Sequence, residues 1–279
     1  MSRSKIQTRN FFSEKAKASF LHKGLYVLLF FKIIFSLQAA KISYGIFPVS
    51  FSTLWSKIVY FPLVLSAYNF ELFYFTLAAI VLISIFLPVN FFCALLNFWI
   101  SALVIRLTIH FTAGPDLVLR SFLFISIFLT SIPGFLKLVY LQNLIFDFGV
   151  IIGRIQICLI YFISGVDKIA TREWRNGQAM FAVFQRDYMI IELFRKDYGS
   201  LVNISLGWMV ILFEILFFVL IWFRPFKVPL IILGIVFHLF IAIVLSLPDF
   251  GFLLIITYLF FFLKIEQDWF FFGRKFKPA

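Results

Sequence analysis

The sequence predicts an all-α, polytopic integral membrane protein: a bundle of about eight transmembrane helices with both termini cytoplasmic. Of the 279 residues, 63% are hydrophobic and only 14% are charged, and the mean hydropathy is +1.03. Soluble domains are about half apolar and roughly a quarter charged, so this chain has too few polar side chains to cover a water-facing surface. Lipid must therefore surround most of the protein, which excludes a secreted, nuclear or cytosolic globular enzyme.

Eight apolar runs have about the length that a helix needs to cross the hydrocarbon core. They are expected at residues 24–40, 68–88, 90–111, 118–138, 147–166, 204–223, 228–246 and 250–264, of which the first and last are short. None shows the period-two alternation of a barrel strand, and a helix satisfies its own backbone hydrogen bonds in lipid. Polar turns containing Pro88, Pro225 and Pro248 separate the second run from the third, the sixth from the seventh and the seventh from the eighth. We expect the two helices of each such pair to be antiparallel neighbours.

The net charge of +12 predicts orientation in the membrane rather than nucleic-acid binding. Basic residues gather in the tails, 1–23 and 265–279, and cytoplasmic segments of membrane proteins carry such an excess. The tail at 1–23 is polar and is not followed by a cleavage motif, so no cleavable signal is expected. We expect a single domain, 1–279, in a bacterial cytoplasmic membrane. Residues 167–203 then form an external loop, in which 179–196 is expected to make a surface helix.

Cysteine and histidine usage predicts no metal centre. Cys93 and Cys158 both lie in apolar runs, where a thiol is expected to behave as a small buried hydrophobe. The three histidines, His22, His110 and His238, are too scattered to indicate a zinc site. Phosphate-binding loops and nucleophile elbows are also missing from the sequence.

Two ionisable residues fall within the sixth and seventh runs, where a charge is costly and calls for an explanation. Glu214 and His238 are nearly equidistant from the turn at Pro225, which predicts similar depths on antiparallel helices. A carboxyl and an imidazole at one depth can share a proton or hydrogen bond and orient a polar headgroup. The alternative is that they only satisfy one another, or a backbone carbonyl, as interhelical contacts.

A second group of polar residues lies where the fifth run ends. Lys168, near Tyr161 and Trp174, is expected at the outer edge of the bundle, where partial burial disfavours the ammonium form and suits a lysine to act as a base. Alternatively, this lysine extends to the interface or pairs with Asp167. His110, Asp116 and Arg120 are expected at the same level, either facing the same cavity or as loop residues.

This second group carries a family resemblance. The stretch 154–169, which reads RIQICLIYFISGVDKI, together with Trp174, Gly177, Ala179 and Met180, resembles a segment of vitamin K-dependent gamma-glutamyl carboxylase. That enzyme belongs to the larger HTTM (horizontally transferred transmembrane domain) family. Phe237-His238 followed by Phe250-Gly251-Phe252 is similar to the family's Phe-His motif, and Phe31-Lys32-Ile33 to its opening motif. Glu214 occupies the place of an acidic residue in the preceding family helix.

The resemblance implies a site that uses a reduced quinone, such as menaquinone or vitamin K. In the carboxylase, the lysine matching Lys168 is regarded as the base that takes a proton from the reduced quinone, and the histidine matching His238 lies at the quinone site. Two departures stand out: the carboxylase has two successive lysines where this chain has Asp167-Lys168, and it carries a large lumenal domain. Small bacterial members that mature a sporulation-delaying peptide toxin share the short plan of this chain.

We therefore predict a quinone-dependent, carboxylase-like or peptide-maturation enzyme of the membrane. Lys168 and His238 are the expected catalytic residues, and His238, Glu214, Trp174 and Tyr161 are expected to bind the cofactor. The expected partners are membrane lipid and a small secreted peptide substrate. Two alternatives remain: a non-enzymatic membrane partner in peptide-toxin maturation or immunity, and a small transporter, which would need more charged residues along its path.

Overall fold

The computed structural model describes residues 3–46, 63, 69–131, 139–185 and 199–265, and every regular element within them is a helix. Four helices are long and apolar enough to cross a membrane: Glu14–Ser43, Tyr140–Ala170, Ser200–Leu220 and Arg224–Ile243. Three shorter apolar helices accompany them in this part of the chain: Phe70–Phe86, Phe91–Leu107 and Pro248–Phe261. The prediction of an all-helical membrane protein is therefore confirmed.

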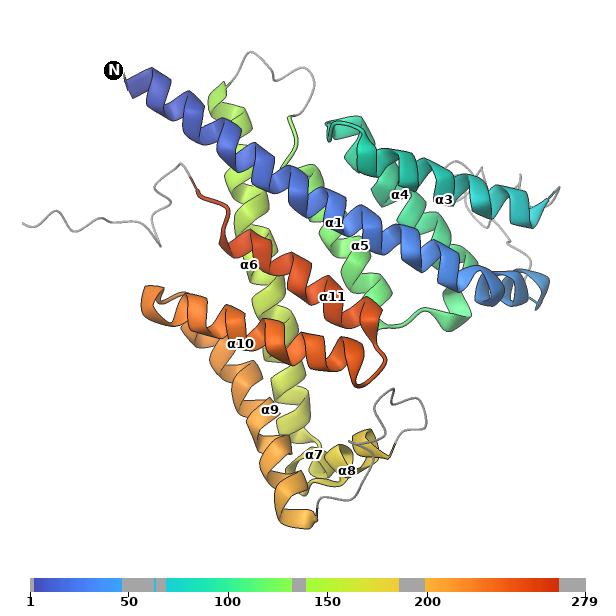
Figure 1. The fold of residues 1–279 in the computed structure, drawn as a ribbon, viewed down its shortest axis with the longest axis vertical. Helices are drawn as coiled ribbons and strands as arrows, with labels where there is room; N and C mark the ends of the chain where they lie inside the picture. Colours follow the sequence, from blue (N-terminus) through green and yellow to red (C-terminus); the bar gives the residue numbers. More distant parts are fainter. Residues whose placement is uncertain (1–2, 47–62, 64–68, 132–138, 186–198, 266–279) are drawn as a thin grey trace, which may run out of the picture. The chain divides into compact units, whose positions relative to one another are not determined.

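The chain divides into two compact units (Figure 1). The first comprises Met1–Ile152 with Leu259–Ala279, and the second comprises Gly153–Tyr258. The helices of the first unit are α1 (Arg3–Ile46), α3 (Phe70–Phe86), α4 (Phe91–Leu107), η2 (Ile109–Phe111), α5 (Gly114–Ile127), the start of α6 (Val139–Ala170) and most of η4 (Tyr258–Phe261). The rest of α6, α7 (Arg172–Arg175), α8 (Gln178–Phe184), α9 (Ser200–Leu220), α10 (Arg224–Ile243) and α11 (Pro248–Thr257) form the second.

In the first unit, α1 packs against α3, α4 and α5. Leu25 and Ile33 of α1 and Phe122 of α5 are fully buried there, as an apolar helix stripe requires. Polar contacts reinforce this packing: His22 of α1 lies 2.8 Å from the backbone oxygen of Ser126, and Lys32 forms an ion pair of 2.6 Å with Asp116. Asp116, expected near the candidate site, thus has a partner within its own unit, which also contains His110 and Arg120.

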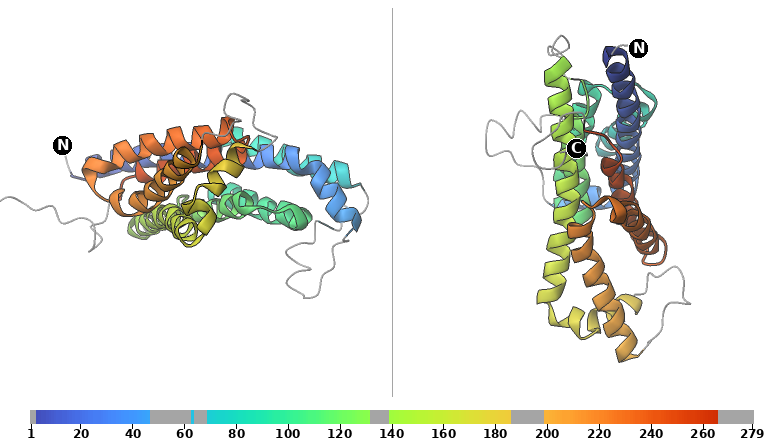
Figure 2. Two further views of the ribbon diagram at one scale, coloured as in Figure 1. Left: turned by 90° about the horizontal axis from the view of Figure 1, so that it is seen from below. Right: turned by 90° about the vertical axis from the view of Figure 1, so that its left-hand side faces the viewer.

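In the second unit, the C-terminal part of α6 runs beside α9, and α10 lies against α11 (Figures 1 and 2). Gly251 of α11 allows this last approach, because a Cβ there would collide with the backbone oxygen of His238. The helices α9 and α10 diverge from the short connection that joins them (Figure 1). The two helices contact one another, so the prediction that they are neighbours is confirmed, but the prediction that they run antiparallel is wrong.

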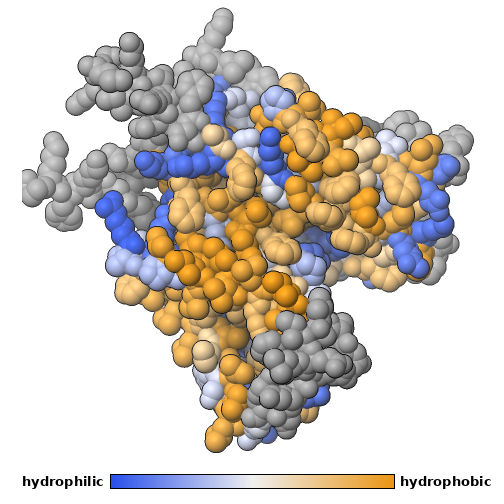
Figure 3. Space-filling model, in the orientation of Figure 1, coloured by the Kyte–Doolittle hydropathy of each residue, from blue (hydrophilic) through white to orange (hydrophobic). Residues whose placement is uncertain are grey.

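Lipid-facing character is visible on the surface of α10. Ile232, Val236, Leu239 and Ile243, spaced three or four residues apart, are all exposed, and apolar side chains dominate this face in Figure 3. A large exposed apolar surface is unfavourable in water and normal in a bilayer. It agrees with the surroundings that the composition predicts.

Each of the eight expected runs overlaps a helix, but several bounds differ. The first run lies inside the 44-residue α1, which extends through most of the expected tail 1–23, and α5 ends at Ile127, well before 138. Pro225 lies in the first turn of α10 rather than in the connection, because proline lacks the N–H that a first turn leaves unpaired. In the expected loop 167–203, α6 extends to Ala170 and α8 covers Gln178–Phe184; 186–198 lie outside the described residues.

Candidate functional site

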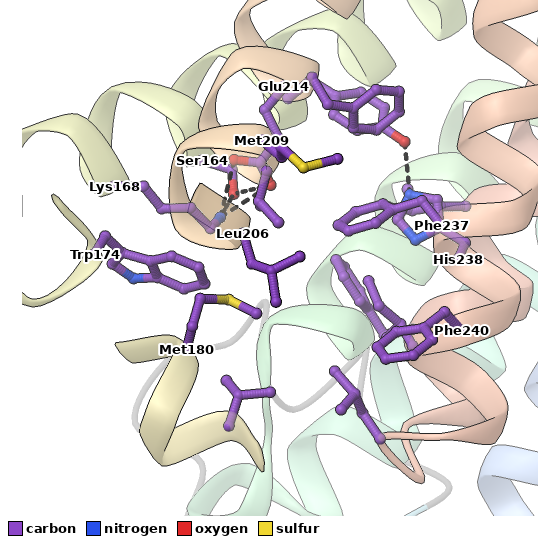
Figure 4. Close-up of a pocket in the computed structure, with 18 of the residues that line it drawn as sticks. Ser164, Lys168, Trp174, Met180, Leu206, Met209, Glu214, Phe237, His238 and Phe240 are labelled. Carbon is purple, nitrogen blue, oxygen red and sulfur yellow. Dashed lines mark hydrogen bonds and ion pairs between the residues drawn. The ribbon is translucent and has the colours of Figure 1, made fainter. Parts of the chain in front are cut away.

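The second unit contains a pocket of about 390 Å³. Its walls come from α6, α8, α9, α10 and α11, with Trp174 of α7 at one side. Leu206, Phe237, Phe240 and Met180 are among the apolar side chains that make up most of the lining. Figure 4 shows Lys168, Ser164 and Glu214 on one side of this pocket and His238 on the other, with apolar side chains between them. The pocket is thus an apolar chamber with two polar ends.

The first polar end is a closed cluster of Lys168, Glu214 and Ser164. The Lys168 Nζ lies 2.9 Å from both carboxylate oxygens of Glu214 and donates to the Ser164 Oγ at 2.5 Å. The Ser164 hydroxyl in turn donates to Glu214 Oε1 over 3.0 Å. Because each of the three ammonium hydrogens has an acceptor, the cluster holds the lysine in place as an ion pair.

The local sequence explains why this cluster forms. Ser164 and Lys168 are one helical turn apart on α6, so both side chains project from the same face. Gly165, between them, faces α9: a Cβ there would lie 2.8 Å from Ile215 Cδ1 and 3.3 Å from Glu214 Cβ. The glycine therefore brings the two backbones close enough for Lys168 to reach Glu214.

Trp174 covers the lysine from the pocket's edge. The Lys168 Nζ lies 5.0 Å from the centroid of the Trp174 ring, within the range of a cation–π interaction. The short helices α7 and α8 meet at Gly177, whose φ of +82° is one that residues with a side chain rarely adopt. This turn directs α7 and α8 back along α9 and fixes the tryptophan over the ammonium group.

The second polar end is a chain of three rings. The Tyr161 hydroxyl lies 2.6 Å from His238 Nε2 and also makes a hydrogen bond with the Tyr258 hydroxyl. All three side chains are almost completely buried, with exposures of 1–2%. Gly234 makes room for the Tyr258 hydroxyl, because a Cβ at that position would overlap it. In the described part of the chain, the second ring nitrogen of His238, Nδ1, has no hydrogen-bond partner.

The structure places all five predicted site residues, Lys168, His238, Glu214, Trp174 and Tyr161, in the lining of this one pocket. It does not join Glu214 to His238 as expected: Glu214 pairs with Lys168, and His238 bonds to Tyr161. Two features separate them: α9 and α10 diverge from their connection (Figure 1), and His238 lies fourteen residues after Arg224 while Glu214 lies only six before Leu220.

The alternatives for Lys168 are also decided by the geometry. Asp167 is exposed, and the lysine pairs with Glu214 instead of this neighbour. The Lys168 side chain is only 14% exposed and points toward Glu214. The partial burial expected of Lys168 is therefore present. Its counter-charge is Glu214, which was expected to lie beside His238.

Two residues that form hydrogen bonds in the site, Ser164 and Tyr258, were not predicted from the sequence. Ser164 could have been predicted from its spacing, since it precedes Lys168 by one helical turn and so projects from the same face. Tyr258 has no such spacing pattern, because it is 97 residues from Tyr161, at the end of a short apolar helix. Only the packing of α10 against α11 brings it close to His238. Among the described residues, no group of three or more His, Cys, Asp or Glu is arranged to hold a metal ion.

Comparisons with known proteins give one match, which covers this unit. No curated protein and no solved structure matches the chain. The family model of the HTTM domain matches residues 130–269, which are 140 of the 279 residues and include every residue of the pocket described above. With half of its length matched, and with the lysine and histidine of the resembling motifs lining one chamber, the chain belongs to the HTTM domain family.

Proposed function

We propose that this protein is a membrane enzyme that binds a quinone-like lipid in the pocket of the second unit and uses Lys168 as a base. The observation that carries the proposal is the pocket itself: one apolar chamber with a lysine–carboxylate cluster at one end and a buried histidine with a spare ring nitrogen at the other. Small-molecule sites are typically of this kind, mostly apolar with a few placed polar groups.

The residues fit such a ligand. A fused aromatic head with two oxygens is flat and apolar, and Leu206, Phe237 and Phe240 offer matching surface. The His238 Nδ1 is buried without a partner in the described part of the chain, and an unpaired buried polar atom is costly unless something bonds to it. A ligand oxygen would remove that cost. Trp174 would close the lysine side of the chamber.

The ion pair determines when Lys168 can act as a base. While water fills the pocket, it helps to stabilise the charges of the ion pair, and the lysine holds its proton. When an apolar ligand excludes that water, a charged pair becomes less favourable, and transfer of the proton from Lys168 to Glu214 removes both charges. The neutral amine is then the base that faces the ligand, with Ser164 holding its position. A bound reduced quinone would supply the acidic hydroxyl and the reducing electrons.

We further propose a topology of eight spans with both termini cytoplasmic, in a bacterial cytoplasmic membrane. Support comes from the basic ends of the sequence and from a helix at each expected run. In this arrangement the cluster at Lys168 lies near the outer face, where a small secreted peptide would reach it.

The direct test is lipid extraction from the purified protein. Wild type, Lys168→Ala and the control Lys41→Ala are purified from membranes, and quinone is quantified in the extracts while each variant is tested for complementation. Lys41 pairs with Glu71 on the surface of the other unit and should not matter. We expect quinone with wild type and Lys41→Ala, and loss of complementation with Lys168→Ala. If no quinone copurifies and Lys168→Ala complements normally, the enzyme proposal fails.

A second function has one specific observation in its favour. The Lys168–Glu214–Ser164 cluster satisfies all its own donors, as a purely structural ion pair does. This favours a non-enzymatic membrane partner in peptide-toxin maturation or immunity. In that case Glu214→Gln and His238→Gln retain function, while truncation within 167–203 abolishes it. The enzyme proposal expects the opposite for His238→Gln, which separates the two.

A further inference from the structure

The two ring nitrogens of His238 have different surroundings. Nε2 lies 2.6 Å from the Tyr161 hydroxyl, and Nδ1 has no partner among the described residues. The Tyr161 hydroxyl is itself shared, because it also bonds to the hydroxyl of Tyr258. Within the described residues, Tyr161 is the hydrogen-bond partner of the Tyr258 hydroxyl. Three groups and two hydrogen bonds therefore form one linear chain.

Counting hydrogens along this chain leaves two neutral arrangements. In the first, Tyr258 donates to Tyr161, Tyr161 donates to Nε2, and the imidazole hydrogen is on Nδ1. In the second, Nε2–H donates to Tyr161 and Tyr161 donates to Tyr258, which leaves the Tyr258 hydroxyl hydrogen without an acceptor. A buried donor without an acceptor loses its hydration with no compensation. Each arrangement leaves one hydrogen without an acceptor, that of Nδ1–H in the first and that of Tyr258 in the second, but the second also leaves the Nδ1 lone pair without a donor. The first arrangement has one unpaired polar group fewer and is the favoured one.

An imidazolium is excluded by the surroundings of the ring. His238 is 1% exposed, and its ring contacts the aromatic rings of Tyr161, Phe237, Phe250 and Tyr258. The carboxylate that lines the same pocket, Glu214, is already bonded to Lys168 and Ser164. A buried charge with no counter-charge bonded to it is strongly disfavoured.

We infer that Tyr161 is a positioning residue that fixes His238 as a neutral imidazole with its hydrogen on Nδ1. The other nitrogen of a functional histidine often sets the tautomer in this way. The Nδ1–H of His238 is then a hydrogen-bond donor without an acceptor among the described residues, and the Nε2 lone pair is taken up by the Tyr161 hydroxyl. The two polar ends of the chamber thereby have separate roles: Lys168 accepts a proton, and His238 donates a hydrogen bond.

This assignment names the ligand atom that His238 recognises. The atom must be an acceptor oxygen, such as a hydroxyl oxygen of the reduced quinone or a carbonyl oxygen of the oxidised form, and the identification of that ligand rests on the proposed function. The tautomer itself does not, since it follows from Tyr161, Tyr258 and His238 alone. The role of Tyr161 also changes: its hydroxyl is occupied by two protein groups, so it acts through His238.

Nitrogen NMR of the protein labelled with ¹⁵N at histidine tests the tautomer directly. The chain has only three histidines, so the spectrum contains three pairs of ring-nitrogen signals. The pair that is missing from the His238→Gln variant belongs to His238. At neutral pH we expect a one-bond coupling to hydrogen at Nδ1 and none at Nε2. The Tyr258→Phe variant keeps the donor to Nε2 and should leave this pattern unchanged. Tyr161→Phe removes the donor and should give a mixture of both tautomers.

The inference is overturned if wild type carries the hydrogen on Nε2 or on both nitrogens, or if Tyr161→Phe leaves the pattern as it was. The wild-type spectrum decides the tautomer even if a variant folds poorly. Two probes then test the ligand atom: menadione, which has two carbonyl oxygens, and methylnaphthalene, which has none. We expect menadione alone to shift the Nδ1–H signal downfield. An equal shift with methylnaphthalene contradicts an acceptor oxygen. A confirmed tautomer without menadione binding contradicts the proposed function only.

Discussion

At the residue scale, the proposed chemistry depends on the ion pair between Lys168 and Glu214. Both side chains are mostly buried, at 14% and 7% exposure, and each is the other's counter-charge. Removing one member of a buried pair leaves the other unpaired, whereas removing both leaves apolar surface in an apolar pocket. The two kinds of change therefore have different costs, although they delete the same contact.

A double-mutant cycle should reveal this coupling. Lys168→Met and Glu214→Leu are each expected to destabilise the protein by about 3 kcal/mol, because each isolates a buried charge. The combination should cost less than the sum of the two by roughly 1 kcal/mol or more. Thermal unfolding in detergent measures the differences. Additive costs would mean that the two side chains do not interact in solution.

At the element scale, glycines determine how closely the helices of the second unit approach. Gly165 joins α6 to α9 at the lysine cluster, and Gly234 admits the Tyr258 hydroxyl at the histidine. These contacts have no periodic signature in the sequence. Lys168 and His238, by contrast, can be identified from the sequence, because they interrupt apolar runs where a polar group is energetically costly.

Gly165→Val should separate α6 from α9. The added Cβ would lie 2.8 Å from Ile215 Cδ1, so the helices must move and the ion pair lengthens. We expect a loss of about 1 to 3 kcal/mol of stability from overpacking, together with loss of bound lipid. Gly114→Ala is the matched control: a Cβ at Gly114 meets nothing within 4 Å, and its effect should stay below about 0.5 kcal/mol. Similar stability of the two variants would contradict close α6–α9 packing.

The sequence predicts which segments form helices better than it predicts where those helices begin and end. Run length and hydropathy identified a helix at each of eight places, since lipid allows few other structures. The ends depend on single residues, and prolines expected to break helices instead begin α10 and α11. That shift, together with the divergence of α9 and α10 (Figure 1), separates Glu214 from His238.

At the scale of the whole molecule, the topology makes a prediction of its own. In a background with Cys93 and Cys158 replaced by alanine, a single cysteine at Ser4 or Lys275 should react with a membrane-impermeant maleimide only after the cells are opened. A cysteine at Asn176, between α7 and α8, should react in intact cells. Labelling of Ser4→Cys and Lys275→Cys on opposite sides of the membrane would require an odd number of spans.

The proposed function requires that an apolar lipid occupies the chamber between the Lys168 cluster and His238. A photoactivatable menaquinone analogue, cross-linked in native membranes and mapped by peptide mass spectrometry, measures this directly. We expect labels on Leu206, Phe237 and Met180, which line the pocket, and the loss of these labels when unlabelled menaquinone competes. Labels confined to Ile232 and Val236 on the lipid-facing side of α10 would contradict it.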